Sequence, residues 1–238
     1  MKLEYHNGVR ITKMYHELSP FEAAIARYEE MAEKHFDTIK RKGKLNAEQA
    51  AEKAKALAFL AAERRKLDAI ASVQGQLEEY RERGLDATRG YGAERVKAVR
   101  LLRQESHHPT DVLESYMFAE GQIKPSKLHT AHHIVPGLGK LKEVTARTRA
   151  YLHSFGIRIN DPANGVYLLH KDEYTPHWSM PESRGHLKYH TKDYERWISR
   201  SVRALSHIDT IKTQLQIIGR LLQQHEPKDI IPKATGVK

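Results

Sequence analysis

The sequence predicts a mostly helical α+β fold, and three observations lead to this prediction. Apolar residues recur at helical spacing through much of the first half of the chain. Short apolar runs typical of strands occur in the second half, at 128–135 and 166–169. A further stripe at helical spacing, between residues 211 and 222, predicts an amphipathic helix near the C-terminal end.

The first half is expected to form a helical hairpin. Ser19-Pro20-Phe21-Glu22 combines a cap, a proline at the first helical position and a capping-box glutamate, and the helix is expected to end at Gly43. Asn46-Ala47-Glu48-Gln49 opens a second helix, for which Gly84 is the expected stop. A basic helix over about 93–106 and a shorter one to Glu120 are expected to follow.

Lys124-Pro125-Ser126 is typical of a linker, so the predicted domain boundary lies near residue 122. Residues 1–122 are then a helical region that serves as an adaptor or as a delivery or docking module. Residues 123–238 are a second domain, closed by the C-terminal helix.

Composition limits the chemistry. The chain has 238 residues and no cysteine, which excludes a disulfide, a thiolate metal site and a cysteine nucleophile. Any metal must therefore be held by histidine, carboxylate, amide or water. No apolar stretch approaches the roughly 20 residues of a membrane span, so no membrane partner is expected. No signal peptide is visible at the start, so synthesis in the cytoplasm is expected.

Charge and histidine content differ along the chain. The net charge is +10, and residues 126–238 carry 18 basic and 10 acidic side chains, net +8. This excess favours a polyanionic partner such as nucleic acid. Eight of the 15 histidines fall between His129 and His190. Histidine is a common metal ligand and the usual general base near neutral pH.

The central motif is Ala131-His132-His133, at the end of a strand-like run that Pro136 stops. Neighbouring side chains on a strand point to opposite faces, so the two histidines can serve different roles. One can bind a metal while the other accepts a proton. After an inserted helix over 140–155 and an extended run at 157–159, Asn164-Gly165 predicts the turn that leads into the returning strand.

A third motif is expected on a helix, where His186 and His190 would share one face. Packed across the strands, these two histidines and His132 would hold one divalent cation, and His133 would deprotonate the attacking water. His177 is an alternative ligand, although a loop fixes its position less well than a helix does. His107-His108-Pro109 is expected to be a surface loop, and Trp178 and Trp197 are expected in the core.

These three motifs, in this order, resemble the AHH nucleases of the HNH/endonuclease VII group, which have the His-Me finger (ββα-metal) fold. The resemblance covers about residues 126–200. It implies phosphodiester hydrolysis that depends on one divalent metal ion (Mg, Mn, Ni or Zn), with His133 as general base. It also implies that His132 joins the helix histidines at the metal, and that Asn164 braces the loop and orients the base.

The resulting hypothesis is a metal-dependent DNA endonuclease, with phosphate contacts from Arg158, Arg184 and Lys188. AHH domains commonly end bacterial polymorphic toxins, so the resemblance implies an antibacterial toxin with a cognate immunity protein. Such a protein would leave the cell by a signal-independent route, perform its reaction in a target cell's cytoplasm, and contact secretion machinery through its N-terminal helices. The alternatives are an RNase of the same fold and a non-catalytic, basic nucleic-acid-binding or scaffold protein.

Overall fold

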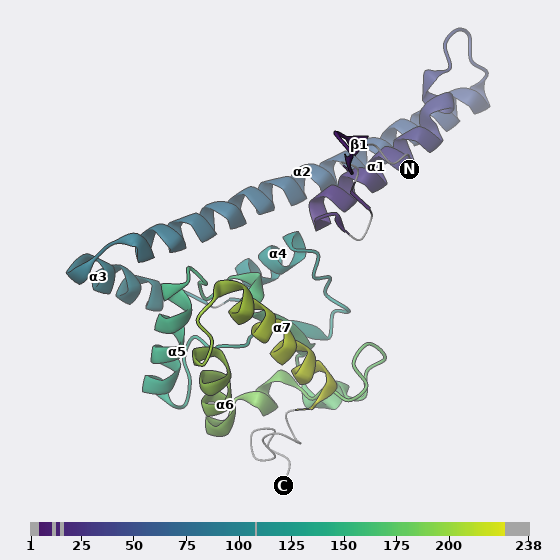
Figure 1. Cartoon of the computed structure of the whole chain (residues 1–238). Coiled ribbons are helices and arrows are strands. Elements are labelled where there is room, and N and C mark those ends of the chain that lie inside the picture. The colour runs from purple at the N-terminus through teal and green to yellow at the C-terminus, as the bar shows by residue number, and fades with distance from the viewer. Residues whose placement is uncertain (1–4, 11–12, 15–16, 108, 227–238) are drawn as a thin grey trace. The chain divides into compact units, whose positions relative to one another are not determined.

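A computed structural model describes residues 5–10, 13–14, 17–107 and 109–226 (Figure 1). The described chain is mostly helical and carries small antiparallel sheets, which confirms the predicted α+β class. Its packing divides it into two compact units. Among the described residues, the N-terminal unit comprises those up to residue 75 and those at 119–121, and the C-terminal unit comprises those at 76–118 and 122–226. No helix in the described ranges is both long enough and apolar enough to cross a membrane.

In the N-terminal unit, α1 (Pro20–Lys40) and the first part of α2 (Ala47–Arg89) form the predicted helical hairpin. The capping box of α1 is present, since the Ser19 side chain accepts from Glu22 N and the Glu22 side chain accepts from Ser19 N. The pair Asn46 and Gln49 does the same for α2. A short β-ribbon, β1 (Tyr5–His6) with β2 (Val9–Arg10), precedes these helices.

Helix α2 does not stop at Gly84, as the sequence predicted, but continues to Arg89. Gly84 does not end the helix, and its missing side chain instead lets residues 156 and 158 pack close to α2. A Cβ at residue 84 would lie 2.9 Å from Cδ of Arg158 and 3.0 Å from the carbonyl oxygen of Gly156. A side chain there would collide with the segment that follows α5, which explains a glycine inside a helix.

The C-terminal unit is built on an antiparallel ladder between β3 (His129–His133) and β4 (Gly165–Leu169). Residues 134–164 leave this ladder and return to it, and they include α5 (Lys142–Ser154) and a 3₁₀ turn (Pro162–Asn164). The turn predicted at Asn164-Gly165 does lead into the returning strand, and it takes the form of this 3₁₀ turn. Asn164 ends the 3₁₀ turn and Gly165 begins β4 at φ −108°, because the Asp161 side chain accepts from Ala163 N and starts the turn there.

The two C-terminal helices, α6 (Lys192–Arg203) and α7 (Ile208–Gln224), complete this unit (Figure 1). Helix α7 packs on β4 and buries most of the predicted apolar stripe. Ile211, Leu215, Ile218 and Leu222 are fully buried, and Leu221 is partly buried. From α6, the buried Glu195 carboxylate accepts from the backbone N–H groups of Lys140 and Leu141. It thereby satisfies amide groups at the start of α5, where helices leave their N–H groups unpaired.

Residues 76–118 pack with the β3–β4 ladder, although the sequence analysis drew the boundary near residue 122. This segment contains the end of α2, α3 (Gly92–Arg103) and α4 (Asp111–Ala119). Leu113 and Met117 of α4 are buried against Ala131 and Tyr167 of the two strands. Apolar side chains from before the linker therefore complete the core of the strands that follow it.

The buried His153 of α5 gives a pH-dependent contribution to stability. Burial and, to a lesser degree, the cationic Arg149, Arg158 and Arg103 together lower its pKa from the ordinary 6.5 to about 3. The unfolded chain then binds a proton below pH 6.5 that the folded chain does not bind, so folding stability falls as the pH drops from 6.5 toward 3.

We therefore expect His153→Leu to flatten the acid side of the stability curve. The change in slope should reach about 1.4 kcal/mol per pH unit between about pH 6 and 4. Urea unfolding across that range measures it, with His207→Leu, at an exposed position, as the control. An unchanged slope in His153→Leu would mean that His153 is protonated in the folded chain.

Candidate active site

The β3–β4 ladder places the two adjacent histidines at its end. His132 lies opposite Val166, and His133 lies opposite Gly165. Both imidazoles are buried, with relative exposures of 3% and 6%. A Cβ on Gly165 would come within 2.6 Å of the Met117 sulfur, so a side chain at residue 165 would force Met117 of α4 to shift.

Asn164 braces the loop that follows the histidines. Its Oδ1 accepts from Val135 N at 2.8 Å, and its Nδ2 donates to the carbonyl oxygens of Val135 at 3.2 Å and Ile159 at 3.0 Å. The side chain is fully buried. These bonds tie the segment after β3 to the segment before β4, and none of them reaches the His133 ring.

The imidazole of His133 is held by Asn160, a residue that the sequence analysis did not single out. His133 Nε2 lies 3.1 Å from Asn160 Oδ1, while Asn160 Nδ2 donates to the carbonyl oxygen of Ser106. An amide oxygen can only accept, so Nε2 carries the proton and Nδ1 is the basic nitrogen of the neutral ring. The Asn160 backbone N–H donates in turn to the hydroxyl of Tyr80 from α2.

The three histidines predicted at the metal lie next to one another. The ring of His132 is 5.1 Å from that of His190 and 6.2 Å from that of His186, centroid to centroid, and the last two are 5.8 Å apart. They do not share a helix, so that part of the prediction is wrong. Residues 186–189 form a 3₁₀ turn, and α6 begins only at Lys192 because the Thr191 side chain caps it.

The electrostatics of this trio suit metal ligation. Burial, and then the neighbouring His190 and His186, hold the pKa of His132 well below its ordinary value. Burial also lowers the pKa of His186. Both rings are therefore neutral near pH 7, which is the form that binds a metal. His186 Nδ1 lies 2.9 Å from the carbonyl oxygen of His170, a donor contact that leaves Nε2 as its acceptor nitrogen.

The neutral imidazoles are thus suitable ligands for a divalent metal, although their positions do not form a metal site. Across residues 5–10, 13–14, 17–107 and 109–226, no group of three or more His, Cys, Asp or Glu side chains converges as it would around an ion. Neutral imidazoles beside one another are nevertheless the ligands that borderline metals such as Zn²⁺ and Ni²⁺ prefer. For one ion to bind all three histidines, their imidazole rings would have to move toward a common point.

These groups line one cavity of about 470 Å³, which also contains two histidines that the sequence analysis missed. His107 was expected in a surface loop, but its ring meets that of His133 edge to face, with centroids 5.7 Å apart. Gly137 makes this possible, since a Cβ there would lie 2.2 Å from His107 Nε2. His170 lies beside His186, with ring centroids 5.4 Å apart. Only the folding of residues 76–118 onto the ladder brings His107 here, so no local sequence signal marks it.

His177 does not join this trio. Its ring lies 4.8 Å from that of His129, and the hydroxyls of Ser126 and Ser179 each contact both rings. The next residue, Trp178, is 79% exposed, which corrects its expected place in the core. Trp197, by contrast, packs against the core as expected.

The three cations expected to contact phosphates each have an internal partner. Arg158 is mostly buried, pairs with Glu105 at 3.0 Å and stacks on the Tyr80 ring. This placement does not present its guanidinium to a substrate. Arg184 makes two hydrogen bonds to the Asp172 carboxylate, and Lys188 lies 3.8 Å from the same group. Both remain partly exposed.

Comparison with known proteins identifies the family to which this site belongs. Residues 113–224 match the model of AHH, a nuclease family of the HNH/ENDO VII superfamily with conserved AHH. No curated protein and no solved structure matches the chain. The match includes the motif Ala131-His132-His133, Asn160, Asn164 and both distal histidines. Residues 113–224 are therefore an AHH-family nuclease domain.

Proposed function

We propose that this protein is a metal-dependent endonuclease that hydrolyses phosphodiester bonds in DNA. One observation carries the proposal: a single cavity contains both His133, whose basic nitrogen is Nδ1, and the trio His132, His186 and His190. Within the trio, lowered pKa values keep at least His132 and His186 neutral. General-base catalysis needs a histidine with an available basic nitrogen, and metal ligation needs neutral imidazoles close together. The net charge of +10 suits a polyanionic substrate.

His133 is the proposed general base. Its Nδ1 takes a proton from a water molecule as the water oxygen attacks phosphorus. The bond from phosphorus to the leaving oxygen breaks, and that oxygen keeps the electron pair and takes up a proton from solvent water. Asn160 keeps His133 in the tautomer that can accept at Nδ1. It is thus a positioning residue.

His132, His186 and His190 would hold a divalent metal. When bound, such an ion polarises a phosphate oxygen and stabilises the negative charge that develops on the leaving oxygen. Burial of His132 keeps the proposed ligand uncharged, so that protons compete weakly with the metal above acidic pH.

His133→Ala should reduce cleavage of plasmid DNA by about 10²- to 10⁴-fold, the usual contribution of a general base. Purified wild type and variant are compared with added Mg²⁺, Mn²⁺, Ni²⁺ or Zn²⁺, on DNA and on RNA in parallel. His177→Ala, in the separate pair with His129, is the matched control. Equal cleavage by wild type and His133→Ala would rule out this role. Binding without cleavage under every ion would favour the non-catalytic alternative, and cleavage of RNA alone would identify an RNase.

Asn160→Ala should lower kcat/KM by at least about tenfold while the protein stays folded, because His133 loses its tautomer and orientation. Asn160→Asp keeps an acceptor for His133 Nε2–H and adds a negative charge, so it should recover part of the activity. The charge should also raise the pKa of His133 and so move the acid limb of the pH–rate profile to higher pH. Equal losses in both variants, with no shift of the profile, would indicate only a structural role.

Replacement of a proposed ligand should weaken metal binding directly. We expect His132→Ala or His190→Ala to raise the Kd for Ni²⁺ or Zn²⁺ by at least about tenfold in calorimetry, since each removes one ligand of three. His177→Ala should bind as the wild type does. An unchanged Kd in both ligand variants would place the metal elsewhere.

The toxin role, with an immunity protein, a secretion partner and a target in another cell's cytoplasm, rests on the resemblance to AHH toxins. Induced expression of the whole chain in bacteria tests it. Loss of cellular DNA with wild type but not with His133→Ala would support it, and normal growth with both would count against it.

A further inference from the structure

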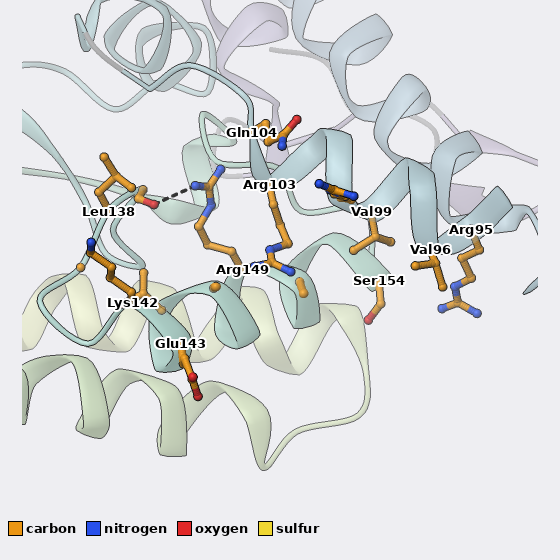
Figure 2. A pocket seen from close by; sticks show the side chains of 16 residues that line it. Arg95, Val96, Val99, Arg103, Gln104, Leu138, Lys142, Glu143, Arg149 and Ser154 are labelled. Atoms are coloured by element: carbon orange, nitrogen blue, oxygen red, sulfur yellow. Dashed lines mark hydrogen bonds between the residues drawn. The ribbon is translucent and has the colours of Figure 1, made fainter. Parts of the chain in front are cut away.

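A second cavity of about 800 Å³ lies between α3 and α5, next to the histidine pocket. Gly137 and Leu138 line both cavities, so a single loop separates them. We call this second cavity the α3–α5 groove. Figure 2 shows side chains from both helices along it, with Lys142 near Leu138 and Arg95 farther along α3. The cations that line the groove are Arg95, Arg100, Arg103, Lys142 and Arg149.

The groove carries a concentrated positive charge. Arg95, Arg100 and Lys142 are exposed, and in the described part of the chain no ion pair involves any of them. The acidic side chain that lines the groove is Glu143, and it forms an ion pair with Arg147, whose Nη2 lies 3.4 Å from Glu143 Oε2. Charges of one sign along a concave surface reinforce one another and attract an extended polyanion.

Arg149 adds a second, independent observation. Arg149 is buried, with a relative exposure of 5%, and its guanidinium donates to the carbonyl oxygens of Gly137 at 2.8 Å and Leu102 at 3.5 Å. Its Nε has no hydrogen-bond partner among the described residues. Its charged neighbours include Glu105, which favours the cation and is itself paired with Arg158, and Arg103, whose positive charge opposes it. An anion in the groove would stabilise both guanidinium groups.

We propose that the α3–α5 groove binds the sugar–phosphate backbone of the nucleic acid that is cut in the histidine pocket. This inference rests on the proposed nuclease function and extends it to a binding track. Arg95, Arg100 and Lys142 contact phosphates. The bound nucleic acid strand crosses the loop at Gly137, which borders both cavities, to reach the histidine pocket. Helix α3, at residues 92–103, precedes the family match at 113–224, so this part of the track lies outside the matched region.

Binding measured without cleavage tests the groove. The triple variant Arg95→Gln/Arg100→Gln/Lys142→Gln is compared with Arg200→Gln/Arg203→Gln/Arg220→Gln, which removes the same charge at exposed positions of α6 and α7 outside the groove. Fluorescence anisotropy with EDTA present follows a duplex of about 20 base pairs, DNA in one arm and RNA in the other, over a range of salt concentrations.

The groove variant should lose about 2 to 3 units of slope in the plot of log Kobs against log salt, since each phosphate contact contributes about 0.9. Its Kd should rise at least about tenfold at moderate salt, and more than that of the control variant. Equal effects of the two triple variants would overturn the groove and indicate only a general charge effect. Absence of binding by the wild type in both arms would overturn it too.

The single variants Arg95→Gln and Lys142→Gln keep the test decisive if the triple variant unfolds. Each should reduce the slope by about 1 while circular dichroism stays unchanged. The result is separable from the nuclease proposal, because the anisotropy assay needs no metal and no cleavage. A wild type that binds through the groove but never cuts would leave the groove standing and remove the proposed reaction.

Discussion

The candidate site depends on one buried amide. Asn164 connects the segment that leaves β3 with the segment that enters β4, through hydrogen bonds to Val135 and Ile159. Every backbone group that it satisfies is buried, and an unsatisfied buried donor or acceptor costs about 1–3 kcal/mol. Because these bonds close residues 134–164 into a loop at the end of the ladder, they fix where the histidine strand ends.

The same closure explains how two neighbouring histidines come to have different partners. His132 faces His190, which lies just before α6, and Tyr194, which lies in the first turn of α6. His133 faces the end of the returning loop, where Asn160 lies. Alternation along a strand separates the two rings, and the braced loop supplies the polar partner for the second. Proton transfer and metal ligation can then occupy one cavity without sharing a side chain.

The sequence was enough to predict the fold class, the helical hairpin, the two strands and the buried stripe of α7, because these depend on local spacing and caps. It was also enough to gather His132, His133, His186 and His190, which the structure brings to one cavity. The prediction that one helix carries His186 and His190 was wrong, since α6 begins only at Lys192, after the Thr191 cap.

Residues that depend on long-range packing could not be predicted in this way. His107 and the hydroxyl of Tyr80 reach the site only because residues 76–118 fold onto the ladder. Nothing near His107 in sequence signals this, and its neighbouring proline favours a loop. Likewise Arg158, expected at the surface, fills the space beside Gly84 in α2.

Net charge was a poor guide to where the cations gather. The excess of positive charge lies in residues 126–238, and this excess predicted phosphate contacts from the cations nearest the histidine motifs. Two of these, Arg158 and Arg184, are engaged by Glu105 and Asp172. The α3–α5 groove instead draws most of its cations from α3, in the half whose net charge is close to neutral. What a polyanion meets is the local arrangement of unpaired charge on a concave surface, and folding, rather than composition, determines that arrangement.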